Sequence, residues 1–134
     1  MSTFATTKKY IDAGEPLTAN SLEILKIDYT TLLNLSAKMG FKTIAIARGK
    51  DEEELVKKLG ARQYIDNRSQ NAVEELNKLG GAKVILATVS SGKAMSEILG
   101  GLAVNGKLVI IGASDEPIQV PSFLFISGRR SLRG

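Results

Sequence analysis

The sequence has 134 residues, the length of a single domain. Hydrophobic residues make up 43% and charged residues 24%, values that exclude a disordered chain and permit a buried core. There is no cysteine and no histidine, which excludes disulfides, thiolate metal sites and a histidine general base. With carboxylates as the remaining ligands, the composition argues against a zinc site.

The net charge is +4, and part of the excess lies near the end of the chain in Arg129, Arg130 and Arg133. We interpret these arginines as a solvated end, and the low aromatic content argues against nucleic-acid binding. The start of the sequence does not resemble a signal peptide, and no apolar run reaches about 18 residues. We therefore expect a cytoplasmic protein that does not enter a membrane.

The first third of the chain has the weakest pattern. Lys8–Ala13 is compatible with a short helix that ends at Gly14. An apolar segment then predicts a first strand at Leu22–Ile27, and a helix is expected from about Asp28 to Met39.

A repeated unit follows, in which an amphipathic stretch leads to a glycine and then to an apolar run. The glycines lie at positions 40, 60, 80 and 106. Glycine just past a helix accepts the left-handed conformation that ends it, and an apolar run suits a strand covered on both faces. The predicted strands are Thr43–Ala47, Tyr64–Ile65, Val84–Ala87 and Leu108–Ile111.

The helices between these strands have recognisable starts and faces. Asp51 with Glu54, and Asn71 with Glu74, each match a capping box. Glu53–Lys57 and Glu54–Lys58 are spaced to form ion pairs on an exposed face. The side chains predicted to face the sheet are Leu55, Val56, Leu59, Val73, Leu76 and Leu79.

The last part of the chain continues the alternation. A helix is expected from Gly92 to Leu99, Pro117 and Pro121 bracket a loop, Phe123–Ile126 is apolar, and Ser131–Arg133 begins another strand. Alternating helices and strands imply parallel strands with right-handed crossovers. The prediction is an α/β fold, a Rossmann-like doubly wound parallel sheet of about five to six strands in one domain over residues 1–134. An α+β arrangement of unrelated elements is the alternative.

Ligands of open parallel sheets bind beyond the carboxyl ends of the strands. Here those ends carry Arg48-Gly49-Lys50, Thr88 to Gly92, and Gly112 to Ser114. Small residues let a ligand approach the backbone, although they are also ordinary in loops. An arginine at the end of the second strand accommodates a 2′-phosphate, so Arg48 and Lys50 favour NADP over NAD. The alternative for this pair is a solvated strand end.

One required feature of a dinucleotide site is missing. The turn after the first strand should be rich in glycine so that the backbone approaches the pyrophosphate. The sequence from Ile24 to Tyr29 contains no glycine, and Asp28 places a carboxylate where a phosphate would lie. We therefore expect pyrophosphate binding to be weak or lost.

Residues 37–134 resemble the cofactor-binding domain of the zinc-type, medium-chain alcohol dehydrogenases. The resemblance is carried by Ala37–Gly49, Lys57–Asp66, Leu79–Thr88, Gly101–Ala113 and Gly128–Gly134. The first 36 residues fit less well, and residues 1–20 resemble at most a remnant of the hinge before the first strand.

The resemblance implies roles for individual residues. Arg48 and Lys50 occupy the ribose end of the cofactor site, whereas Thr88, Val89, Gly112 and Ala113 occupy positions that flank the nicotinamide. It also implies a homodimer that pairs through Ser131–Gly134. The family's catalytic zinc domain has no counterpart in the sequence, so the chain is similar to a fragment, an eroded paralogue or an excised domain.

Three functions are compatible with these observations. The first is an oxidoreductase by descent that retains some NADP binding and catalyses no alcohol oxidation alone. The second is a non-enzymatic Rossmann-like interaction module that has lost its cofactor, and the third is a nucleic-acid binder that uses the basic end.

Overall fold

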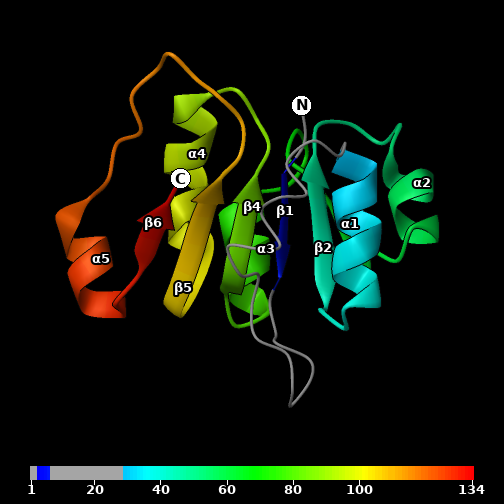
Figure 1. Ribbon diagram of the computed structural model, residues 1–134, viewed down its shortest axis with the longest axis horizontal. Helices are drawn as coiled ribbons and strands as arrows, with labels where there is room; N and C mark the ends of the chain where they lie inside the picture. Colours follow the sequence, from blue (N-terminus) through cyan, green and yellow to red (C-terminus); the bar gives the residue numbers. More distant parts are fainter. Residues whose placement is uncertain (1–2, 7–28) are drawn as a thin grey trace.

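The computed structural model describes Thr3–Thr6 and residues 29–134. The strands among these residues form one six-stranded sheet, in the order β3-β2-β1-β4-β5-β6 (Figure 1). The strands are β1 (Thr3–Thr6), β2 (Thr43–Ala47), β3 (Gln63–Asp66), β4 (Ala82–Ala87), β5 (Leu102–Ile110) and β6 (Ser131–Arg133). The helices are α1 (Tyr29–Lys38), α2 (Glu53–Lys58), α3 (Ala72–Lys78), α4 (Gly92–Ile98), the short 3₁₀ helix η2 (Leu99–Gly101) and α5 (Ser122–Gly128).

The predicted α/β, Rossmann-like class is confirmed, with one difference in the middle of the sheet. β2 pairs with β3, and β4, β5 and β6 pair with one another, all in parallel. Between these two groups lies β1, which runs antiparallel to both β2 and β4. The expectation of an all-parallel sheet is therefore wrong at this strand, which the sequence pattern did not predict.

The predicted first strand, Leu22–Ile27, lies outside the described residues, and so do the short helix predicted at Lys8–Ala13 and the turn from Ile24 to Asp28. The assignment of residues 1–134 to one domain with a hinge remnant at 1–20 therefore stays a prediction.

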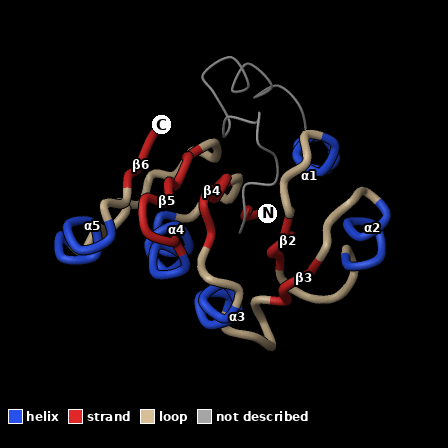
Figure 2. The backbone as a smooth tube through the Cα atoms, turned by 90° about the horizontal axis from the view of Figure 1, so that it is seen from below, coloured by secondary structure: helices blue, strands red, loops and turns tan. Residues whose placement is uncertain are grey.

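Helices cover both faces of the sheet, as a doubly wound fold requires (Figure 2). Along β2, Ile44 and Ile46 pack in one core with residues of α3 and α4, whereas Ala45 and Ala47 pack in a second core with residues of α1 and α2. The alternation follows from the two-residue period of a strand. Every residue of β2 is buried, which explains why Ile44–Ala47 is an uninterrupted apolar run. The hydroxyl of the remaining residue, Thr43, is hydrogen-bonded to that of Ser36 at 2.9 Å.

Three of the four repeat glycines have the expected conformation. Gly40, Gly60 and Gly80 have φ of 87°, 108° and 93°, in the left-handed region, just past α1, α2 and α3. Gly106 is different because it lies inside β5, and the left-handed residue there is Asn105. A Cβ on Gly106 would lie 2.8 Å from the carbonyl oxygen of Ala82, so this glycine permits a close approach between strands.

The two predicted capping boxes have different outcomes. The Asn71 side chain accepts hydrogen bonds from the backbone N–H groups of Val73 and Glu74 and so caps α3. At α2 the N-cap is Glu52, and its side chain makes no capping hydrogen bond, so the prediction for Asp51 is wrong. Both predicted ion pairs of α2 form with N–O distances of 2.8 Å.

The predicted faces of the helices are mostly confirmed. Val56 and Leu76 are fully buried, and Leu59 and Leu79 pack against the two cores. Leu55 is 49% exposed, contrary to the prediction, because α2 turns only one narrow side toward the sheet.

Arg130 is part of the fold near the end of the chain. Its side chain donates hydrogen bonds to the carbonyl oxygens of Leu102, at 3.0 Å, and Leu124, at 2.7 Å. The guanidinium thereby links α5 to the start of β5. One of the three arginines interpreted as a solvated end is therefore structural, which weakens the case for a basic nucleic-acid surface.

Candidate functional site

Hydrogen bonds to one carboxylate, that of Asp66, connect the loop after β2 with the loop after β3. In the parallel pairing of β2 with β3, Ala47 lies opposite Asp66. Asp66 Oδ1 accepts hydrogen bonds from the backbone N–H of Gly49, at 2.8 Å, and of Arg68, at 2.9 Å. Its other oxygen accepts from the Ser69 hydroxyl at 3.1 Å. The position of Arg48 is therefore set by a residue that comes 18 positions later in the sequence.

The same contacts determine the electrostatics of this corner. Asp66 is 8% exposed, and the hydrogen bonds from the backbone of Arg68 and Gly49 hold its pKa below the usual value. Tyr64 donates its hydroxyl to the carbonyl oxygen of Gly49 at 2.5 Å. Burial raises the pKa of Tyr64, with nearby carboxylates, Glu52 first, adding to the effect. A charged Asp66 and a neutral Tyr64 thus hold the loop from both sides at neutral pH.

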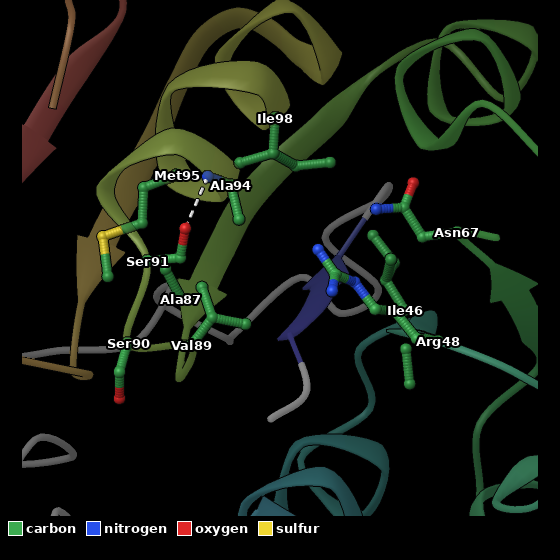
Figure 3. A pocket seen from close by; sticks show the side chains of 11 residues that line it. Ile46, Arg48, Asn67, Ala87, Val89, Ser90, Ser91, Ala94, Met95 and Ile98 are labelled. Carbon is green, nitrogen blue, oxygen red and sulfur yellow. Dashed lines mark hydrogen bonds between the residues drawn. The ribbon is translucent and has the colours of Figure 1, made fainter. Parts of the chain in front are cut away.

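A hollow of about 300 Å³ opens between the carboxyl ends of β2 and β4, across the central β1 (Figure 3). Arg48 and Asn67 border it on one side, whereas residues of the loop after β4 and of α4 border the other. Its walls are largely apolar, including Ile46, Val89 and Met95. This is the crevice between the two halves of the sheet in which open α/β folds bind their ligands, and its volume is at the lower end for ligand sites.

A second, more open hollow of about 810 Å³ continues from the first and shares Arg48, Asn67, Ala94 and Ile98 with it. Residues 68–73, after β3, form most of its remaining wall. Arg68 belongs to this wall, and so does Glu97, which pairs with Lys93 at 3.9 Å. The first hollow is therefore mainly apolar, and the second is mainly polar and charged.

Among the other predicted site residues, Thr88 and Val89 follow β4, and Gly112 and Ala113 lie just beyond β5. The Thr88 hydroxyl oxygen is buried and has no hydrogen-bond partner in the described part of the chain. Gly112 packs against this loop so closely that a Cβ would lie 2.1 Å from the Val89 carbonyl oxygen. The glycine is needed for contact between the ends of β4 and β5, a structural requirement separate from ligand contact.

The structure brings two of the six predicted site residues, Arg48 and Val89, to the smaller hollow. Lys50, Thr88, Gly112 and Ala113 line neither hollow, although Thr88 and Gly112 form the neighbouring strand ends. The sequence analysis missed Asp66, Asn67 and Arg68. Part of their signal was present, because these residues follow the predicted strand Tyr64–Ile65 and the carboxyl ends of parallel strands meet at one edge of a sheet.

The residues present do not fit a zinc ion. The sequence has neither cysteine nor histidine, and the described residues contain no group of three acidic side chains that could hold a metal. In the described part of the chain, no helix combines the length and hydrophobicity that crossing a bilayer demands.

Comparison with known proteins agrees with this arrangement. Residues 30–134 match the family model described as "Zinc-binding dehydrogenase". The chain is 38% identical over 98 residues to Alcohol dehydrogenase patD of Aspergillus clavatus, a match that covers 73% of this chain and 25% of that protein. A probable mannitol dehydrogenase of Fragaria ananassa is 34% identical over 97 residues, covering 72% and 26%.

Solved structures show the same fold. Benzyl alcohol dehydrogenase from Acinetobacter calcoaceticus superposes with a TM-score of 0.75 at 22% identity, covering 79% of this chain and 31% of that one. A putative zinc-binding dehydrogenase from Sinorhizobium meliloti, solved bound to NADP, has a TM-score of 0.71 at 18% identity and covers 78% and 33%. The chain spans about a quarter of the length of the curated relatives it matches. It belongs to the zinc-binding dehydrogenase family and corresponds to a fragment of those oxidoreductases.

Proposed function

We propose that the chain is the nucleotide-binding part of an NADP-dependent alcohol dehydrogenase. The observation that carries the proposal is the hollow between the ends of β2 and β4, with Arg48 at its rim. Its apolar walls suit the flat adenine ring, and the guanidinium suits a 2′-phosphate on the adjoining ribose. We assign the oxidation of an alcohol to a longer protein with a catalytic domain, as in relatives of which this chain covers about a quarter.

Binding is expected to be weak because the turn that should receive the pyrophosphate has no glycine between Ile24 and Tyr29. Isothermal titration calorimetry with NADPH and with NADH tests the proposal. We expect both to bind, NADPH about tenfold more tightly, a difference of about 1.4 kcal/mol.

Arg48→Gln should remove most of that preference, because it deletes a charged group facing the phosphate. Arg62→Gln is the matched control, since Arg62 is exposed at the opposite end of β3. Absence of heat with either dinucleotide at millimolar concentration would refute the proposal and favour the interaction module that has lost its cofactor.

A homodimer through Ser131–Gly134 is a second part of the proposal. β6 pairs with β5 on one side, and no described strand covers its other edge. α5 lies beside β6 (Figure 1). It exposes Phe123 (78%) and Ile126 (77%), which suits an apolar contact. Light scattering after size-exclusion chromatography should give a dimer mass, and Leu132→Glu should give a monomer. A monomer for the unaltered chain at high concentration would contradict this.

A cytoplasmic location completes the proposal, and cell fractionation of the full protein would test it.

A further inference from the structure

The five parallel strands begin at one edge of the sheet, the lower edge in Figure 1, opposite the edge that carries the two hollows. A basic residue lies at the start of each of them. Lys42 directly precedes β2, Arg62 directly precedes β3, and Lys83 is the second residue of β4. Lys107 in β5 lies opposite the first residue of β6, and Arg129 comes two positions before β6. We call these five residues the basic edge.

The register of the strands places the basic edge in one row. Thr6, the last residue of β1, lies opposite both Thr43 and Val84. Lys42 and Lys83 therefore each come one position before the same level of the sheet. Because neighbouring strands lie about 4.8 Å apart, a row that runs from β3 to β6 spreads its positive charge over about 24 Å.

The charges of the basic edge are not neutralised within the described part of the chain. Among the ion pairs of the described residues, none includes a member of the basic edge. Arg62, Lys83 and Arg129 are exposed, and Lys42 and Lys107 are half-buried. Like charges in a row repel one another, and an external surface of negative charge would offset that repulsion.

The acidic residues of the described part lie elsewhere. Glu97 pairs with Lys93 in α4. The others follow the ends of strands or lie at the starts of helices, at positions 51–54, 66, 74–75 and 115–116. The described part of the chain therefore has one edge that is basic and an opposite edge where acidic and basic residues are mixed.

The fold itself does not require most of these cations. The lysines in the last turns of α1, α2 and α3 complement the helix dipoles. Lys42, Arg62, Lys83 and Lys107 instead precede or belong to strands. A sheet has only a small net dipole, so cations at the starts of its strands gain no comparable stabilisation. Four members of the basic edge are thus available to a partner.

Two exposed aliphatic side chains accompany the basic edge. Met39, three positions before Lys42, is 36% exposed, and Val104, three positions before Lys107, is 55% exposed. Phe41, the aromatic residue beside Lys42, is buried and offers no face on which a base could stack. Cations combined with exposed aliphatic groups are typical of surfaces that bind at the headgroup level of an anionic membrane. A flat anionic bilayer therefore fits this edge better than a strand of nucleic acid.

We propose that the basic edge binds the surface of an anionic phospholipid bilayer, with Met39 and Val104 in contact with the headgroup region. The chain lies on the bilayer and does not cross it. The two hollows lie at the opposite edge of the sheet, so they stay open to the solvent when the basic edge is occupied. The inference goes beyond nucleotide binding and does not depend on it.

Sedimentation of the unaltered chain with vesicles tests the proposal. One set of vesicles is phosphatidylcholine alone, and the other contains about one third phosphatidylserine, which supplies the negative surface potential. We expect the chain to bind the mixed vesicles at low ionic strength and to bind phosphatidylcholine alone at least tenfold more weakly. Binding should be lost in about 1 M salt, where the screening length falls to about 3 Å.

Two double variants with the same change of net charge locate the surface. Lys42→Ala combined with Lys83→Ala should weaken binding to the mixed vesicles about fivefold for each lysine. Lys50→Ala combined with Lys93→Ala removes two charges at the opposite edge and should leave the binding unchanged. Thermal unfolding establishes that both variants fold, and Lys83→Ala alone, at an exposed position, replaces the first double variant if that one unfolds.

A further variant distinguishes a bilayer from other polyanions. Val104→Ser leaves the charge unaltered and should weaken vesicle binding about threefold, because it removes apolar contact. No binding to the mixed vesicles, equal binding to both kinds of vesicle, or equal weakening by the two double variants would overturn the proposal. Tighter binding to a duplex oligonucleotide than to the mixed vesicles would overturn it as well and would assign the basic edge to nucleic acid.

Discussion

At the scale of single residues, the charge of Asp66 holds two loops together. Backbone hydrogen bonds from Arg68 and then Gly49 lower its pKa in the folded chain relative to the unfolded one. Its stabilisation is therefore complete above the ordinary pKa of about 4 and is lost as the pH falls through the lower folded value. Asp66→Asn should lower the free energy of unfolding at pH 7, and the difference should shrink in acid.

Thermal unfolding between pH 3 and pH 7 checks this prediction. Asp115→Asn is the control, because Asp115 is exposed in the loop after β5 and should behave as the unaltered chain does. A constant difference between Asp66→Asn and the unaltered chain at every pH would contradict the electrostatic role.

Two adjacent glycines give a second test at this scale. Gly80 and Gly81 both have positive φ, at 93° and 82°, but a Cβ on Gly80 would meet no atom within 4 Å. On Gly81 it would lie 2.8 Å from the backbone of Ala103. Gly80→Ala should cost about 1 kcal/mol of conformational strain, and Gly81→Ala about 2 kcal/mol more from the clash. Urea denaturation measures both, and equal costs would refute the steric argument.

At the scale of elements, the starts of α2 and α3 look alike in sequence and differ in the structure. Asn71 caps α3 with its side chain, whereas the Asp51 side chain does not cap α2. Asn71→Ala should therefore lower the free energy of unfolding by about 1 kcal/mol, and Asp51→Ala by less than about 0.5 kcal/mol. Chemical denaturation of the two variants provides the comparison, and an equal loss would mean that both residues act as caps.

The helices also show how far local pattern predicts an element. The glycines after α1, α2 and α3 have the conformation that their position predicted, because a helix end is a local structure. Gly106 does not, because the chain before it runs through η2 into a long strand, β5, with no helix end at that position. The neighbouring sequence therefore predicts a helix-ending glycine correctly only where a helix comes directly before that glycine.

At the scale of the whole molecule, we predict that this chain alone oxidises no alcohol. It offers neither cysteine nor histidine to hold a zinc ion. An assay with NADP and a primary alcohol, with and without added zinc, should show no NADPH formation above the rate without protein. Zinc-dependent turnover would contradict the prediction.

The candidate site was partly predictable for a physical reason. Arg48 was found because it ends an apolar strand, and the ends of parallel strands meet at the ligand edge of the sheet. Asp66 and Arg68 were missed because their role depends on a contact with Gly49, 17 residues from Asp66 in the chain. Sequence spacing does not show which strand end a carboxylate will touch.

The sequence by itself determined the α/β alternation, the burial of both faces of β2 and the family, because hydrophobic period, helix-ending glycines and residue identity are properties of short segments. Only the tertiary structure decided that β1 enters the sheet antiparallel between β2 and β4, and that Asp66 joins the loop after β2 to the loop after β3. The position of β1 and the contacts of Asp66 both depend on which segments, distant in the sequence, lie side by side. The packing of the two cores against the sheet determines these neighbours.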